Sequence, residues 1–229
     1  MKTFALGITG GSGAPYALRV LEGLLAAGHE VHAVVSGAGT KILALETNLR
    51  PGRSARSIEA ALREHVAARL QDDAPGTLRV FDHQNVAAPI ASGSFDCAGM
   101  AVVPCSTGSL GRIAAGISGN LIERAADVKL KERRPLVLVP RETPLHLGHI
   151  RLLAQAAEIG AIIMPPMPAF YHRPQTLDDI INQTVNRVLD LFDIELGRDL
   201  FNRWQGPSPT PGGRQAGQTP PTDSPGRKD

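Results

Sequence analysis

Short apolar runs recur along the first 165 residues of the chain, each about five residues long. This length and the abundance of Val, Ile, Leu and Ala are typical of strands that are buried on both faces. The predicted strands are 4–8, 31–35, 98–103, 135–139 and 161–164, with a minor strand at 79–81.

Amphipathic segments lie between these runs and predict helices. In the first one, apolar side chains repeat at helical spacing from Leu18 to Leu25. Pro15 suits the first turn of this helix, and Gly28 suits its C-terminal cap. Further helices are predicted at 57–70, 109–115, 147–159 and 177–191. Strands that alternate with helices predict a single α/β domain with a Rossmann-like, doubly wound parallel sheet.

The composition changes near the end of the chain. Residues 206–229 hold five glycines and six prolines, and Ala216 is the one apolar side chain there besides proline. Such a segment buries too little surface to offset the entropy of ordering it, so we expect a disordered tail. The domain is therefore expected to span residues 1–205.

Charge and cysteine content narrow the class of protein. The formal net charge is +2 and aromatic residues make up 4% of the chain. Neither value favours a nucleic-acid or membrane-surface partner. Cys97 and Cys105 can form neither a disulfide framework nor a zinc site, and the N-terminus does not read as a signal peptide. We therefore expect a cytoplasmic protein.

A glycine-rich loop follows the first strand, with the sequence Gly10-Gly11-Ser12-Gly13-Ala14. Small residues before a helix let backbone N–H groups approach a phosphate, although a tight turn with positive φ also needs glycine. A dinucleotide loop would have glycine at Tyr16, and a P-loop would have Gly-Lys-Ser/Thr. The second strand ends at Ser36 with no acidic residue for a ribose, which favours a mononucleotide such as FMN over NAD or ATP. Ser36 itself could bind this ligand or simply cap the next helix.

A second loop of this kind follows the strand at 98–103 and contains Ser106, Thr107, Gly108 and Ser109. Two such loops at neighbouring strand ends predict a cleft with many hydrogen-bond donors. Cys105 precedes the loop without an obvious histidine partner, so it is interpreted as a packing residue and not as a nucleophile.

Charged residues gather later in the chain. Most charges of the segment 120–134 are interpreted as a solvated helix face with ion pairs. Arg141 and Glu142 follow a predicted strand, where side chains of this fold face a ligand. Tyr171 follows a stiff proline-rich loop at another strand end, and its side chain is either presented by that loop or packed in the core. Arg187, taken alone, is interpreted as a surface charge.

Several motifs together resemble the UbiX/Pad family of flavin prenyltransferases. They are 7–14, 104–106, 124–128, 130–134, 141–145 and 168–171, and the similarity runs from residue 1 to about residue 206. The resemblance implies a flavodoxin-like flavoprotein that forms a homododecamer and needs no metal.

The resemblance also implies roles for individual residues. FMN would be held by Gly10, Gly11, Ser12, Ser36, Ser106, Thr107, Gly108, Ser109 and Arg141. Dimethylallyl phosphate would be bound by Gly93, Arg124, Lys131, Tyr171 and Arg187, partly from neighbouring subunits. Glu142, Glu46 and Ser12 match the catalytic residues, and the match is weaker for Glu46 because residues 50–85 align poorly.

The implied reaction joins the dimethylallyl group to N5 and then to C6 of reduced FMN. The prenylated FMN would serve UbiD-type decarboxylases, as in ubiquinone biosynthesis. Positive side chains aimed at the departing phosphate fit this chemistry because they stabilise the charge that develops on it. Two alternatives remain open at this point: a flavin-dependent decarboxylase of aromatic or ubiquinone-precursor acids, and a non-catalytic flavin carrier.

Overall fold

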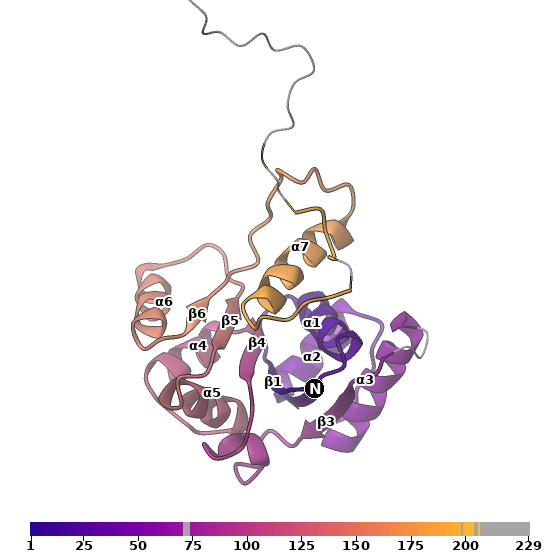
Figure 1. Ribbon diagram of the computed structural model, residues 1–229. Helices are drawn as coiled ribbons and strands as arrows, with labels where there is room; N and C mark the ends of the chain where they lie inside the picture. The colour runs from indigo at the N-terminus through magenta and orange to yellow at the C-terminus, as the bar shows by residue number, and fades with distance from the viewer. Residues whose placement is uncertain (71–73, 198, 204–205, 207–229) are drawn as a thin grey trace, which may run out of the picture.

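In the computed structural model, the described residues are 1–70, 74–197, 199–203 and 206. Six parallel strands form one sheet in the order β3-β2-β1-β4-β5-β6 (Figure 1). They are β1 Thr3–Ile8, β2 Glu30–Val35, β3 Thr77–Phe81, β4 Gly99–Cys105, β5 Leu136–Pro140 and β6 Ile162–Ile163. The chain moves outward in both directions from β1 and β4, so the crevice expected in doubly wound sheets lies at their carboxyl ends.

Helices cover both faces of this sheet. Their bounds are α1 Ala14–Ala26, α2 Gly37–Glu46, α3 Ala55–Leu70, α4 Thr107–Ala114, α5 Leu121–Lys131, α6 Leu147–Glu158 and α7 Leu177–Asp190, with a 3-10 turn η1 at Pro89–Ala91. One buried cluster joins the sheet to α1, α3 and α7, and the other joins it to α4, α5 and η1. The predicted doubly wound α/β fold is thus confirmed.

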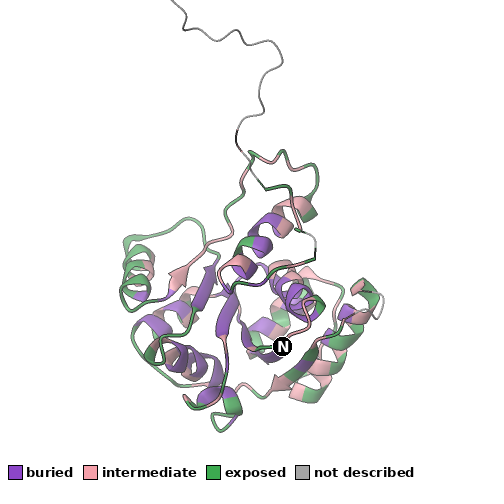
Figure 2. Cartoon of the chain, viewed as in Figure 1, coloured by how far each residue is buried: buried purple, intermediate pink, exposed green. Residues whose placement is uncertain are grey.

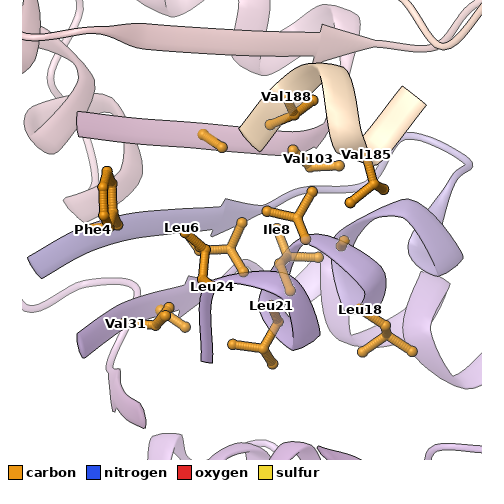
Figure 3. Packing of buried hydrophobic residues seen from close by; sticks show 14 of the residues in the cluster. Phe4, Leu6, Ile8, Leu18, Leu21, Leu24, Val31, Val103, Val185 and Val188 are labelled. Atoms are coloured by element: carbon orange, nitrogen blue, oxygen red, sulfur yellow. The ribbon is translucent and has the colours of Figure 1, made fainter. Parts of the chain in front are cut away.

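The alternation of side chains along β1 divides the core between these two clusters. Phe4, Leu6 and Ile8 point to the face covered by α1, where they meet Leu21 and Val188 (Figure 3). Ala5 belongs to the cluster on the opposite face. Side chains alternate between the two faces of a strand, and helices cover both faces of this sheet. Nearly every position of a central strand is therefore buried, which explains why the strands read as continuous apolar runs.

The predicted element boundaries differ from the observed ones by one or two residues in most cases. The first helix has proline in its first turn, and Gly28 follows its end with φ of 74°, as predicted. The last strand is shorter than predicted, because only Ile162 and Ile163 pair with β5. The minor strand is longer, since all five residues of β3 pair with β2 at the edge of the sheet.

Most charges of the segment 120–134 are exposed or half-buried and several form ion pairs, as predicted, but the helix within it is more buried than its charges suggest. Helix α5 covers the sheet, and seven of its eleven residues are buried. They include Glu123, which is 3% exposed, and Lys129, which is 1% exposed. A charge pattern alone did not reveal the apolar stripe of Leu121, Ala125 and Val128 that lies between the charges.

Burial is uneven among the helices, as Figure 2 shows by colour. The central strands are almost entirely buried, whereas Ala156 is the one buried residue of α6. Among the described helices, none has the length and hydropathy needed to span a lipid bilayer. The predicted tail lies outside the described residues except for Gly206.

Candidate functional site

Three loops meet at the carboxyl ends of β1, β2 and β4. They line a hollow formed by Gly10 from the first loop, Ser36 and Gly37 from the second, and Ser106, Gly108 and Ser109 from the third. We call this the α2–α4 hollow, because the N-termini of α2 and α4 open into it. The structure therefore brings together residues that are 96 positions apart in the chain and were predicted to bind one ligand.

Capping serines shape two walls of the α2–α4 hollow. The Ser36 hydroxyl accepts a hydrogen bond from the Gly39 N–H at 3.0 Å, and that of Ser106 accepts from the Ser109 N–H at 3.3 Å. The capping interpretation of Ser36 is thus confirmed. The positive ends of two helix dipoles converge on the hollow, which suits an anion such as a phosphate.

Buried Thr9 fastens the first loop to the third. Its hydroxyl donates to the Pro104 carbonyl at 2.8 Å and accepts from the Ser106 N–H at 2.7 Å. Gly10 is needed because a Cβ there would lie 2.6 Å from Cβ of Ala38. At Gly108, in contrast, a Cβ would meet nothing within 4 Å, so that side of the hollow is open to a ligand.

The glycine-rich loop itself holds a carboxylate of the chain. Glu46, at the end of α2, accepts hydrogen bonds from the N–H groups of Gly13 and Ala14, each at 2.8 Å. These two N–H groups at the N-terminus of α1 are thus paired with a carboxylate of the chain itself, while Gly10, Gly11 and Ser12 remain the predicted flavin-binding part of the loop. The N-termini of α2 and α4, in contrast, open into the α2–α4 hollow.

The predicted catalytic residues Ser12 and Glu46 lie together in this arrangement. Burial raises the pKa of Glu46, but hydrogen bonds from the Ser12 side chain and from the two backbone N–H groups outweigh it, so the pKa is lower than usual. The positive charge of Arg141 lowers this pKa further, so Arg141 is near enough to interact with the Glu46 carboxylate. Glu46 is thus ionised at neutral pH.

Arg141 and Glu142 follow β5 at the same edge of the sheet, and both are exposed. The Glu142 carboxylate accepts a hydrogen bond from the Thr143 N–H at 3.0 Å, which fixes its position in the loop. An exposed carboxylate beside a ligand crevice can transfer protons to and from a bound ligand.

The predicted substrate residues fall into two groups in a single chain. In the first group, Arg124 donates to the Ala91 carbonyl at 3.2 Å and pairs with Asp127 at 3.0 Å. Lys131 pairs with Glu132 at 2.7 Å, and a Cβ on Gly93 would lie 2.7 Å from the lysine Nζ. Gly93 therefore gives the backbone room to pass directly beside Lys131.

The second group, Tyr171 and Arg187, belongs to the opposite face of the sheet. Arg187 lies on α7, which packs on α1, whereas α5 carries Arg124 and Lys131 on the other face. Helix α5 also runs away from the carboxyl edge, so Lys131 lies about 10 Å further along the axis than Arg124. One chain does not bring these four side chains to one point.

The α2–α4 hollow has polar residues that the sequence did not single out. His83, Arg112, Asn120 and Glu123 line it beside the capping serines. The spacing of Ser106, Ser109 and Arg112 is a signal that was available, because residues three apart share a helix face.

Burial raises the pKa of the Cys105 thiol to about 12, which confirms Cys105 as a packing residue. Among the residues described, no three His, Cys, Asp or Glu side chains group as metal ligands.

The fold and the hollow define a doubly wound α/β protein whose helix N-termini can bind the phosphate of a mononucleotide. The model of the family described as "Flavoprotein" matches residues 1–189. The chain belongs to this family and, within it, to the flavin prenyltransferases of the UbiX type.

The relatives and structures that support this assignment match most of the chain. It is 53% identical to flavin prenyltransferase UbiX of Escherichia coli K12 over 207 residues, which cover 90% of this chain and all of that protein. It is 48% identical to UbiX of Thauera aromatica over 201 residues, covering 88% and 93% of the two chains.

Two solved structures agree in fold. AnUbiX (PadA1), in complex with FMN and dimethylallyl pyrophosphate, superposes with a TM-score of 0.78 at 38% identity over 90% of this chain and 99% of that one. A dodecameric FMN-dependent UbiX-like decarboxylase from Escherichia coli O157:H7 gives 0.73 at 39% identity over 89% of this chain and all of that one.

Proposed function

We propose that this protein is a flavin prenyltransferase that joins the dimethylallyl group of dimethylallyl phosphate to N5 and C6 of reduced FMN. The observation that carries the proposal is the 53% identity with UbiX enzymes over their whole length. A structural relative that holds FMN together with dimethylallyl pyrophosphate supports FMN and a dimethylallyl donor as the two substrates.

The α2–α4 hollow is the proposed site of the FMN phosphate. Ser36, Ser106 and Ser109 carry hydroxyls there, and Gly10 and Gly108 keep the backbone accessible. Reduced flavin supplies an electron-rich ring on which a carbon–carbon or carbon–nitrogen bond can form. The phosphate anchor would orient that ring along the carboxyl edge toward Glu46 and Arg141.

The departing phosphate of the prenyl donor needs positive charge around it. Arg124, Lys131 and Arg187 supply cations, and the Tyr171 hydroxyl supplies a further donor. Fixed donors stabilise the leaving group without reorganising in the transition state, which lowers the barrier to ionisation of the allyl phosphate. Closing the site against water would protect the allyl cation from hydrolysis.

These cations lie on opposite faces of one sheet, so we propose that neighbouring copies of the chain complete the site. The UbiX-like structure described as dodecameric supports such an assembly. Exposed apolar side chains also support it, including Leu147 and Ile150 on α6 and Met167 and Phe170 in the loop after β6. Size-exclusion chromatography with light scattering tests this point, and a monomer would contradict it.

Two carboxylates near the flavin are proposed to have different roles. Glu46 is ionised and bound to the loop of Ser12 and Gly13, so it would orient the loop and hold negative charge near the flavin. Glu142 is exposed and held through its bond with the Thr143 N–H, so it would transfer the proton released during ring closure.

The test is an anaerobic reaction of the purified protein with reduced FMN and dimethylallyl phosphate, followed by mass spectrometry of the extracted flavin. We expect one added prenyl group in the wild-type product. Glu142→Gln should slow its formation by about 100-fold, as for loss of a general acid or base. Glu64→Gln is the matched control, because Glu64 is an exposed carboxylate on α3.

Two outcomes would contradict the proposal. One is FMN recovered unchanged from the wild-type reaction, as a flavin carrier would leave it. The other is direct release of CO₂ from an aromatic acid by the isolated protein.

We further propose that the product serves a UbiD-type decarboxylase and that the protein works in the cytoplasm, where the free thiols of Cys97 and Cys105 stay reduced.

A further inference from the structure

The wall of the α2–α4 hollow opposite Ser36 contains an ion pair. Arg112 on α4 contacts Glu123 on α5, with 3.0 Å between Nε and Oε1. The other carboxylate oxygen of Glu123 accepts a hydrogen bond from the Gly119 N–H at 2.8 Å. Only 3% of the glutamate side chain is exposed, so it is anchored in place and fixes one edge of the arginine.

The arginine side chain, in contrast, is 60% exposed and lines the hollow. Its position on α4 places it on the face of Ser106 and Ser109, at intervals of three residues. Side chains on a helix lean toward its N-terminus, which here is the end that opens into the hollow. Pairing through Nε leaves the two terminal nitrogens of the guanidinium to donate to a ligand.

The charges of Arg112 and Glu123 offset each other, so this wall does not repel an anion. Glu123 alone would repel a phosphate because both are negatively charged. A buried carboxylate without a partner is also costly. Arg112 compensates this charge and retains donors with the geometry that matches phosphate oxygens. Asn120, at the N-terminus of α5, lines the same wall and adds the positive end of a third helix dipole.

We propose that Arg112 binds the 5′-phosphate of the flavin and that the buried Glu123 positions it. The pair then makes the protein select FMN over riboflavin, which has the same ring without the phosphate. This inference rests on the proposed function, because it concerns the flavin that the enzyme would prenylate.

The experiment measures the dissociation constants of FMN and riboflavin by flavin fluorescence at low salt. Arg112→Ala should weaken FMN binding by about tenfold or more, the scale of one charge-assisted bidentate contact, and leave riboflavin unchanged. Arg112→Lys keeps the positive charge but loses the bidentate guanidinium, so its FMN affinity should lie between that of the wild type and that of Arg112→Ala. Arg56→Ala is the control, because Arg56 is an exposed arginine on α3 that does not line the hollow.

A double variant separates direct contact from simple charge compensation. In Arg112→Ala, the carboxylate of Glu123 is left uncompensated beside the phosphate. Adding Glu123→Gln removes that repulsion and keeps an oxygen that can accept from the Gly119 N–H. We expect FMN affinity to recover only in part, because the donors of Arg112 are still missing.

Three results would overturn the inference. The first is an Arg112→Ala variant whose FMN affinity stays within twofold of the wild type. The second is an equal loss for FMN and riboflavin, which would mean that Arg112 supports the hollow and not the phosphate. The third is full recovery in the double variant, which would reduce Arg112 to a counterion of Glu123. A wild-type protein that binds no FMN would instead contradict the proposed function itself.

Discussion

At the scale of single residues, His32 is a buried histidine with only one of its two ring nitrogens paired. Its ring lies between Phe81 and Phe95, with centroid distances of 4.9 and 5.2 Å. Nε2 lies 3.1 Å from Oε1 of Glu30, which also pairs with Arg79, while Nδ1 is buried without a hydrogen-bond partner. Burial lowers the pKa of His32, although the hydrogen bond with Glu30 opposes the effect.

This pKa predicts how the stability of the protein depends on pH. The pKa of His32 in the folded state is below its unfolded value of about 6.5, so the unfolded state binds the proton more tightly. The free energy of unfolding should therefore fall as the pH drops below 6.5. Denaturant unfolding at several pH values should show a shallower dependence for His32→Leu than for the wild type. Parallel curves would contradict this account. Some dependence should remain in the variant, because the pKa values of His29 and His83 are lowered too.

At the scale of elements, the first turn of α2 packs directly on the end of β1. A Cβ on Gly39 would lie 2.4 Å from the carbonyl oxygen of Ile8, a distance that side chains do not tolerate. The same turn contains the Ser36 cap, so a shift of the helix would also displace one wall of the α2–α4 hollow.

Gly39→Ala should therefore lower the free energy of unfolding by about 1–3 kcal/mol, the usual cost of overpacking. Gly37→Ala is a matched control in the same turn, because its Cβ would meet nothing within 4 Å. It should be neutral or slightly stabilising, since alanine favours helix over glycine. Urea denaturation measures both effects, and equal stability of the two variants would show that α2 can move away from β1 without cost.

At the scale of the whole molecule, the segment that follows α7 ties the end of the domain to its body. Arg203 pairs with Asp190 at 2.7 Å, and the Leu200 N–H donates to Asn186 at 2.9 Å. Leu196 and Leu200 also pack against the cluster around α1 and α7. We therefore propose that the domain extends to about residue 205 and that residues 206–229 add nothing to its stability.

Removing residues 206–229 should leave the melting temperature and FMN affinity unchanged, because this segment has almost no apolar side chains to bury. A truncation that ends at residue 195 should lower the melting temperature clearly, since it also removes the contacts of Leu200 and Arg203. Differential scanning fluorimetry compares the two. A large loss after the shorter deletion would mean that the tail packs on the domain or on a neighbouring copy.

Much of this protein was determined by its sequence alone. The apolar runs predicted the strands, and the small polar residues after Ile8 and Val103 marked two loops at one edge of the sheet. Periodicity and turn residues are local properties, so they can be read without knowing the packing. The resemblance to flavin prenyltransferases, carried by motifs along the chain, agrees with the family found by comparison.

Only the tertiary structure decided which groups meet. It turns Glu46 back onto the N–H groups of Gly13 and Ala14, pairs Arg112 with Glu123, and sets Lys131 on a different face from Arg187. These relations join residues from different helices, and they depend on how each helix is rotated and placed against the sheet. Packing of the two cores sets that placement, and no local pattern of residues encodes it.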